Sequence, residues 1–194
     1  MTAELNLDKE KTAIVVIDLQ KGIASIPTEP YSSKVVIENT AKILKEFRKN
    51  SMPVFLINVT PSKDMKDALR PISETSFSMS NYDSSWSEFV PDLDIQPTDF
   101  RITKHQWGAF YGTELDLQLR RRKIETIILC GISTNIGVES TARFAYEYGF
   151  NQIFVEDAMA ARSKDEHTFP LKHIFPRLGL IKNTDEIITA LNKN

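Results

Sequence analysis

The sequence predicts an α/β protein with a doubly wound, mostly parallel six-stranded sheet and helices on both faces, a Rossmann-type three-layer arrangement. Two observations support this prediction. Short apolar runs rich in β-branched residues lack polar alternation, which is typical of strands buried on both faces of a parallel sheet. Segments with helical spacing of apolar residues lie between these runs. The 194-residue length fits a single domain over residues 1–194.

Six segments are predicted strands, and the last of them has the weakest pattern. In chain order they are TAIVVID (12–18), PVFLINV (53–59), DFRIT (99–103), TIILCGI (126–132), QIFVED (152–157) and LGLIK (178–182).

Four helices are predicted between and after these strands, over 32–50, 112–122, 134–149 and 183–194. Thr113 and Thr184 are the expected N-caps of the second and the fourth of these helices. Gly149 is the expected stop of the third.

Residues 60–98 interrupt the alternation of strands and helices. They are rich in Ser, Asp and Pro and contain Tyr82 and Trp86. We expect a long excursion between the second and third strands that acts as a lid, a partner contact or an ordered surface loop.

Composition excludes several classes of function. Lys and Arg number 24 against 26 Asp and Glu, so the net charge of −2 does not favour nucleic acid or an anionic membrane as the partner. The basic run at 120–123 is interpreted as a cationic helix end. One cysteine excludes an internal disulfide framework and a Cys-rich zinc site. No signal-peptide pattern or membrane-length apolar run is present, so we expect a soluble cytoplasmic protein.

Polar groups at the strand ends indicate where the chemistry lies, because ligands of open α/β sheets bind outside the carboxyl ends of the strands. Asp18 and Lys104 end the first and third strands, and a polar elbow at 131–137 follows the fourth. Taken singly, Asp18 is typical of a loop or helix-cap residue, and Lys104 is typical of a solvated surface residue. Together they supply a carboxylate, an ammonium group and backbone amides able to bind an oxyanion or carboxylate. Glu156 and Asp157 are interpreted as cap or structural residues.

Three motifs carry a resemblance to a known family. VVIDLQ, ITKHQWGAFYGTEL and LCGISTNIGVESTAR resemble, in order and spacing, the isochorismatase-like hydrolase superfamily over nearly the whole chain. Members of undefined activity that carry GISTNIGVESTAR are more similar to this chain than the nicotinamidases are.

The resemblance implies a catalytic set with one member replaced. The Asp and Lys of the cysteine-hydrolase members match Asp18 and Lys104, whereas the position of their nucleophilic Cys is held by Gly137. Cys130 lies seven residues earlier, within the strand, and is interpreted as a buried structural residue whose burial raises its pKa.

The resemblance also implies how the elbow and the pocket are built. A cis peptide is expected between Ile132 and Ser133, with the Ser133 and Gly137 amides forming the oxyanion site and Gln20 close enough to bind substrate. An aromatic wall is expected from Trp107, Phe110 and Tyr111, with packing in the core or against another subunit as the alternative.

Without a thiol, amide hydrolysis through a thioester is not expected. True isochorismatases resemble this chain in having Gly at that position, which implies vinyl-ether cleavage of a small carboxylated or carbonyl compound. Asp18 would deliver the proton, and Lys104 would bind the substrate carboxylate or tune Asp18.

Further expectations concern partners and the alternative function. We expect no cofactor and no metal, since the Asp and His cluster of nicotinamidases is not recognisable, and we expect a homodimer or larger homo-oligomer. The alternative is a non-catalytic protein that keeps the hydrolase fold to bind a small molecule or a partner.

Overall fold

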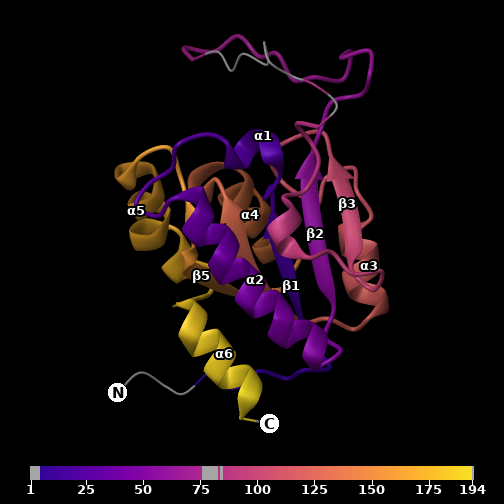
Figure 1. Ribbon diagram of the computed structural model, residues 1–194, viewed down its shortest axis with the longest axis vertical. Helices are drawn as coiled ribbons and strands as arrows, with labels where there is room; N and C mark the ends of the chain where they lie inside the picture. Colours follow the sequence, from indigo (N-terminus) through magenta and orange to yellow (C-terminus); the bar gives the residue numbers. More distant parts are fainter. Residues whose placement is uncertain (1–4, 76–82, 84, 194) are drawn as a thin grey trace.

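A computed structural model describes residues 5–75, 83 and 85–193 (Figure 1). Its six-stranded sheet has the order β3-β2-β1-β4-β5-β6, and every neighbouring pair is parallel. The predicted fold class is confirmed, and the sheet is parallel throughout. The strands are β1 (Thr12–Ile17), β2 (Val54–Val59), β3 (Phe100–Lys104), β4 (Thr126–Ile132), β5 (Asn151–Ala160) and β6 (Leu180–Lys182).

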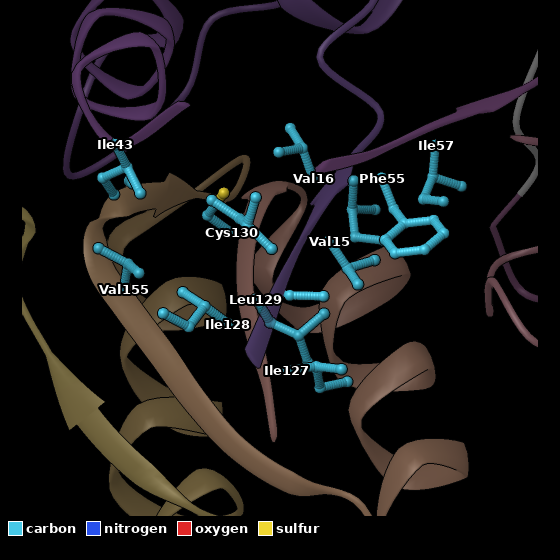
Figure 2. Close-up of a cluster of buried hydrophobic side chains, with 14 of the residues drawn as sticks. Val15, Val16, Ile43, Phe55, Ile57, Ile127, Ile128, Leu129, Cys130 and Val155 are labelled. Carbon is cyan, nitrogen blue, oxygen red and sulfur yellow. The ribbon is translucent and has the colours of Figure 1, made fainter. Parts of the chain in front are cut away.

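The centre of the sheet is apolar on both faces. All six residues of β1 are buried, as are the last six of β4. Side chains from both strands form the cluster of Figure 2, in which Cys130 and its register partner Val16 lie toward Ile43 of α2. Apolar residues without alternation are therefore required here, because helices cover both faces of these strands.

Helices α2 and α6 pack against each other and cover one face of the sheet, in front in Figure 1, while α4 lies behind it. The helices are α1 (Lys21–Ala24), α2 (Ser33–Lys49), α3 (Leu115–Arg121), α4 (Glu139–Glu147), α5 (Lys164–His173) and α6 (Thr184–Asn192). None of the helices in the described part of the chain is long and apolar enough to cross a membrane.

Two predicted N-caps are each displaced by one residue. The N-cap of α6 is Asn183, which forms a capping box with Glu186, and not Thr184. The N-cap position of α3 belongs to Glu114, although the Thr113 hydroxyl accepts from the Leu115 amide. The predicted stop is confirmed: Gly149 follows α4 with a φ of +78°.

Helix α5 was not predicted, because Pro170 lies inside it and Pro normally marks a helix boundary. The helix begins at a Ser163 cap, whose hydroxyl accepts from the Glu166 amide. The basic run at 120–123 closes α3 as expected, and the Arg120 guanidinium also lies over the Phe150 ring.

The second half of the 60–98 excursion is an ordered part of the fold. It runs back along the loop after β1, where the amides of Lys21 and Gly22 donate to the carbonyls of Glu88 and Trp86 at 2.8 and 2.9 Å. Trp86 covers Gly22 so closely that a Cβ at residue 22 would lie 2.0 Å from its ring. Tyr82 lies outside the described residues. Residues 61–75 extend away from the body of the protein at the top of Figure 1.

Candidate active site

The site lies at the point where the strand order reverses. Strands β1 and β4 are neighbours, with Ile17 in register with Gly131, and the chain continues outward to β2 on one side and to β5 on the other. Asp18 follows β1 and the elbow follows β4, so the topology places the carboxylate beside the elbow backbone. Crevices at such switch points are where α/β sheets bind ligands.

Asp18 and Lys104 form a buried ion pair. The Lys104 Nζ lies 2.8 Å from Asp18 Oδ2 and also donates to the Gln106 carbonyl at 3.1 Å. The two residues are 5% and 1% exposed. Asp18 has a left-handed φ of 54°, and its amide donates to the Ile57 carbonyl. Among the described residues, Asp18 Oδ1 has no hydrogen-bond partner.

Burial raises the pKa of the Asp18 carboxyl above its ordinary value, and the adjacent Lys104 ammonium group only partly opposes this effect. Asp18 therefore holds a proton to a higher pH than an exposed aspartate would. Its second oxygen, Oδ1, is buried and accepts no hydrogen bond in the described part of the chain.

Gly137 lies directly over this carboxyl group. A Cβ built on Gly137 would be 3.1 Å from Asp18 Oδ2 and 2.8 Å from Ile17 Cγ2. The structure thus brings together Asp18, Lys104 and Gly137, the three residues that the sequence assigned to catalysis.

The elbow contains the expected cis peptide between Ile132 and Ser133. A π-helical turn, η2 (Thr134–Val138), follows it and leads into α4. The amides of Ile136 and Val138 both donate to the Ser133 carbonyl. Gly131, just before the elbow, has a φ of +121°, and a Cβ there would lie 2.0 Å from the Ile17 carbonyl oxygen, so only glycine fits.

Two side chains that the sequence did not single out hold the elbow. The Thr141 hydroxyl donates to the Gly137 carbonyl at 2.7 Å and accepts from the Ala109 amide at 3.1 Å. His167 Nδ1 and the Thr134 hydroxyl form a buried hydrogen bond of 2.8 Å. A threonine four residues after the glycine in a helix was the available signal for Thr141, since its hydroxyl commonly bonds the carbonyl one turn back.

Gln20 is fully buried, and its carboxamide is bonded to backbone. Its Nε2 donates to the carbonyls of Val59 and Trp86 at 3.0 and 3.2 Å, and its Oε1 accepts from the Val59 amide at 2.8 Å. Gln20 therefore braces the end of β2 and the returning excursion against the loop after β1.

The three predicted wall aromatics have different surroundings. Phe110 is buried against Tyr148 and Phe150, which agrees with the alternative expectation of packing in the core. The Trp107 and Tyr111 side chains are 63% and 70% exposed. The Trp107 carbonyl oxygen is nevertheless 3.6 Å from a Cβ built on Gly137, so the backbone of this segment borders the site.

The remaining candidates have structural contacts. Cys130 is buried within β4, burial raises the pKa of its thiol to about 12, and the Thr40 hydroxyl contacts its sulfur. The Asp157 carboxylate accepts from the Thr184 amide and hydroxyl at the start of α6. The described residues contain no group of three or more His, Cys, Asp or Glu side chains suited to hold a metal ion.

Sequence and structure comparisons agree on one family. The family model described as Isochorismatase domain matches residues 12–186. The Bacillus subtilis protein named uncharacterized isochorismatase family protein YwoC is 48% identical, over 97% of this chain and 98% of its own length. A Pseudomonas chlororaphis protein named probable isochorismatase is 26% identical, over 96% of this chain and 89% of its own length.

A solved structure of an isochorismatase family protein from Burkholderia thailandensis superposes with a TM-score of 0.93 and 45% identity, covering 97% of this chain and 98% of that one. By its sequence and by its fold, this chain belongs to the isochorismatase family of hydrolases.

Proposed function

We propose that this protein hydrolyses a small carboxylated vinyl ether by acid–base chemistry, without a covalent intermediate and without a cofactor. The observation that carries the proposal is the pairing of Asp18, a buried carboxyl with a raised pKa, with a glycine at the position facing it. Among the described residues, Asp18 is thus a candidate proton donor at this site, and the position that faces it carries no side-chain nucleophile.

The proposed reaction needs one proton and one water. Protonated Asp18 gives its proton to the terminal carbon of the vinyl ether, whose π electrons form the new C–H bond and leave an oxocarbenium ion. Water adds to that ion and returns a proton to the Asp18 carboxylate. In the resulting hemiketal, the C–O bond to the leaving group breaks as the hydroxyl becomes the carbonyl, and the hydroxyl proton passes to the leaving oxygen, so an enolpyruvyl ether yields pyruvate and the free alcohol.

Lys104 has the position required to support this cycle. Its ammonium group, 2.8 Å from Asp18 Oδ2, stabilises the carboxylate that remains after proton transfer. The backbone amides of Ser133 and Gly137 would hold an anionic oxygen of the substrate. Gln20 would act through the loop after β1, because its own carboxamide is bonded to Val59 and Trp86.

The similarity to a protein named probable isochorismatase supports this reaction class over amide hydrolysis. Solved neighbours named as a cysteine hydrolase and an N-carbamoylsarcosine amidase share the fold at 23% and 24% identity. This shared fold does not imply thiol chemistry in the present chain, because Gly137 stands at the position of the nucleophilic Cys.

The test is pyruvate release from isochorismate, with Asp18→Asn as the variant. General acid catalysis typically contributes 10²–10⁴-fold, so we expect release to fall by at least about a hundredfold. Asp116→Asn, which changes a half-exposed carboxylate on α3, is the control and should retain the wild-type rate.

The pH profile adds a second readout: the wild-type rate should fall as pH rises through the raised pKa of Asp18. Equal release by wild type and Asp18→Asn would refute the mechanism. Saturable isochorismate binding by the wild-type protein without any pyruvate would favour the binding-protein alternative.

We also propose a homodimer or larger homo-oligomer, formed through an exposed aromatic face. Phe144 on α4 and Tyr148 at the C-cap of α4 pack against each other, and Trp107 and Tyr111 are exposed in the segment between β3 and α3. Phe144 also covers Gly108, which joins the two parts of this face. Exposed aromatic side chains gathered in this way are typical of an interface.

Sedimentation equilibrium tests the assembly. The double variant Trp107→Ser, Tyr111→Ser should lower the measured mass toward that of a monomer, because it removes the most exposed apolar area of the face. Phe169→Ser, at an exposed position on α5, is the control and should leave the mass unchanged. A monomeric wild-type protein would contradict the proposal.

A further inference from the structure

A second concave site lies at the end of the sheet opposite the active site. It is a hollow of about 620 Å³, within the usual range for small-molecule sites. It is bordered by Thr126 and Asn151, the first residues of β4 and β5. Because Asp18 lies at the carboxyl ends and β4 is seven residues long, the two sites are separated by roughly 20 Å of sheet.

Gln152, the second residue of β5, is one of the residues that line this hollow. Side chains two residues apart on a strand point to the same face, so Gln152 shares the face of Phe154, whose ring stacks on Phe175 at 4.0 Å. The walls of the hollow on that face come from the end of α4, including Tyr146, and from the turn after Phe175, including Arg177.

Gln152 is only 2% exposed, yet in the described part of the chain neither its Nε2 nor its Oε1 has a hydrogen-bond partner. Buried polar groups in folded proteins are nearly always paired, and leaving both ends of a carboxamide unmatched is costly. Two other buried side-chain atoms of the described residues also lack a partner: Asp18 Oδ1 in the candidate active site and Asn135 Oδ1 in the elbow. Gln152 therefore carries an unmatched carboxamide, at the opposite end of the sheet from Asp18.

The turn before β6 packs closely against Gln152. A Cβ on Gly179 would lie 2.1 Å from the Gln152 carbonyl oxygen and 2.9 Å from its Cβ. The glycine thus allows this close approach of the turn to β5, beside the hollow.

We propose that this hollow binds a small planar molecule that carries an amide-type edge and an anionic substituent. A carboxamide presents one donor and one acceptor side by side, and the edge of a lactam or pyrimidinedione presents the complementary pair. Arg177 supplies a guanidinium group for the anion, and Tyr146 supplies an aromatic wall. The site is separate from Asp18, so the inference does not depend on the proposed reaction.

Orotate is the probe, because it combines a pyrimidinedione edge with a carboxylate. Titration into ¹⁵N-labelled protein should shift the Gln152 side-chain NH₂ resonances saturably, together with the backbone amides of residues 177–180. Benzoate has the ring and the carboxylate without the amide edge, and it should bind at least about tenfold more weakly.

Gln152→Leu is the matched variant, since it removes both polar atoms and keeps an apolar side chain of similar size. We expect orotate affinity to fall at least about tenfold while the melting temperature stays the same or rises, because no described hydrogen bond is lost. Asp18→Ala should bind orotate as the wild type does.

Three results would overturn the proposal: no saturable shift at Gln152, orotate binding that Gln152→Leu leaves intact, or orotate binding that Asp18→Ala removes. A melting temperature lowered in Gln152→Leu, together with no orotate shift in the wild type, would show that the carboxamide serves the fold alone.

Discussion

At the scale of single residues, Gly137 connects packing with chemistry. Glycine has no side chain, so this position supplies no nucleophile. The absence of a Cβ also lets the elbow lie close against Asp18 and Ile17. Ile17 is fully buried, so its methyl group cannot move away freely. A thiol at residue 137 would therefore need local repacking before it could act.

We predict that Gly137→Ala destabilises the fold by about 1–3 kcal/mol, the usual range for overpacking a well-filled core. The added methyl group would lie 2.8 Å from Ile17 Cγ2. Urea denaturation of the wild type and the variant measures the difference.

The double variant Gly137→Ala, Ile17→Val provides the control, because Val at residue 17 keeps Cγ1 and Cγ2 but drops the δ-methyl group and gives the side chain room to turn. Part of the lost stability should return, relative to Ile17→Val alone. Gly137→Ala with wild-type stability would show that the elbow lies farther from β1 than the structure has it.

Residues at strand ends could be predicted from the sequence, because parallel strands collect their carboxyl ends at one edge whatever the loops do. This rule selected Asp18, Lys104 and the elbow, and the apolar context of Cys130 assigned it to the core. The surroundings of Gln20 could not be predicted in this way. Its partners Val59 and Trp86 are 39 and 66 residues away in sequence, and the hydrogen bonds depend on the path of the excursion.

At the scale of elements, the elbow is a turn whose position is set by the helix after it. Thr141 on α4 bonds both the Gly137 carbonyl and the Ala109 amide, so it ties together the two backbone segments that border Asp18. The periodicity of apolar residues in the sequence predicts the strands and most helices, but it does not predict hydrogen bonds such as those of Thr141. Helix α5 shows the same limit, since tertiary packing stabilises it despite Pro170.

We predict that Thr141→Val lowers the free energy of unfolding by about 1–3 kcal/mol, because the shape is kept while the buried Ala109 amide loses its acceptor. Hydrogen exchange of the Ala109 amide should accelerate more than that of amides in β1. Thr141→Ser keeps the hydroxyl and is the control. Equal exchange at Ala109 in Thr141→Val and in the wild type would contradict the assigned hydrogen bond.

At the scale of the whole molecule, the stability of the fold should depend on pH through groups that the sheet and helices bury. His167 on α5 is 3% exposed and is bonded to Thr134 in the elbow. Burial lowers the pKa of its imidazole to about 4. Asp18 changes the stability with pH in the opposite direction, because its raised pKa lets the folded protein keep a proton that the unfolded chain would release.

We predict that His167 makes the protein lose stability as pH falls from about 6.5 to about 4. In that range the unfolded chain takes up a proton on His167 and the folded protein does not, so unfolding becomes easier. The contribution is fully present above about pH 6.5, decreases through the window and amounts to at most about 3 kcal/mol.

Urea denaturation of wild type and His167→Gln at pH 4.5, 5.5, 6.5 and 7.5 measures it, because the difference between the two cancels the opposing effect of Asp18. His173→Gln, at an exposed position on the same helix, should follow the wild type. A His167→Gln profile parallel to that of the wild type would refute the prediction.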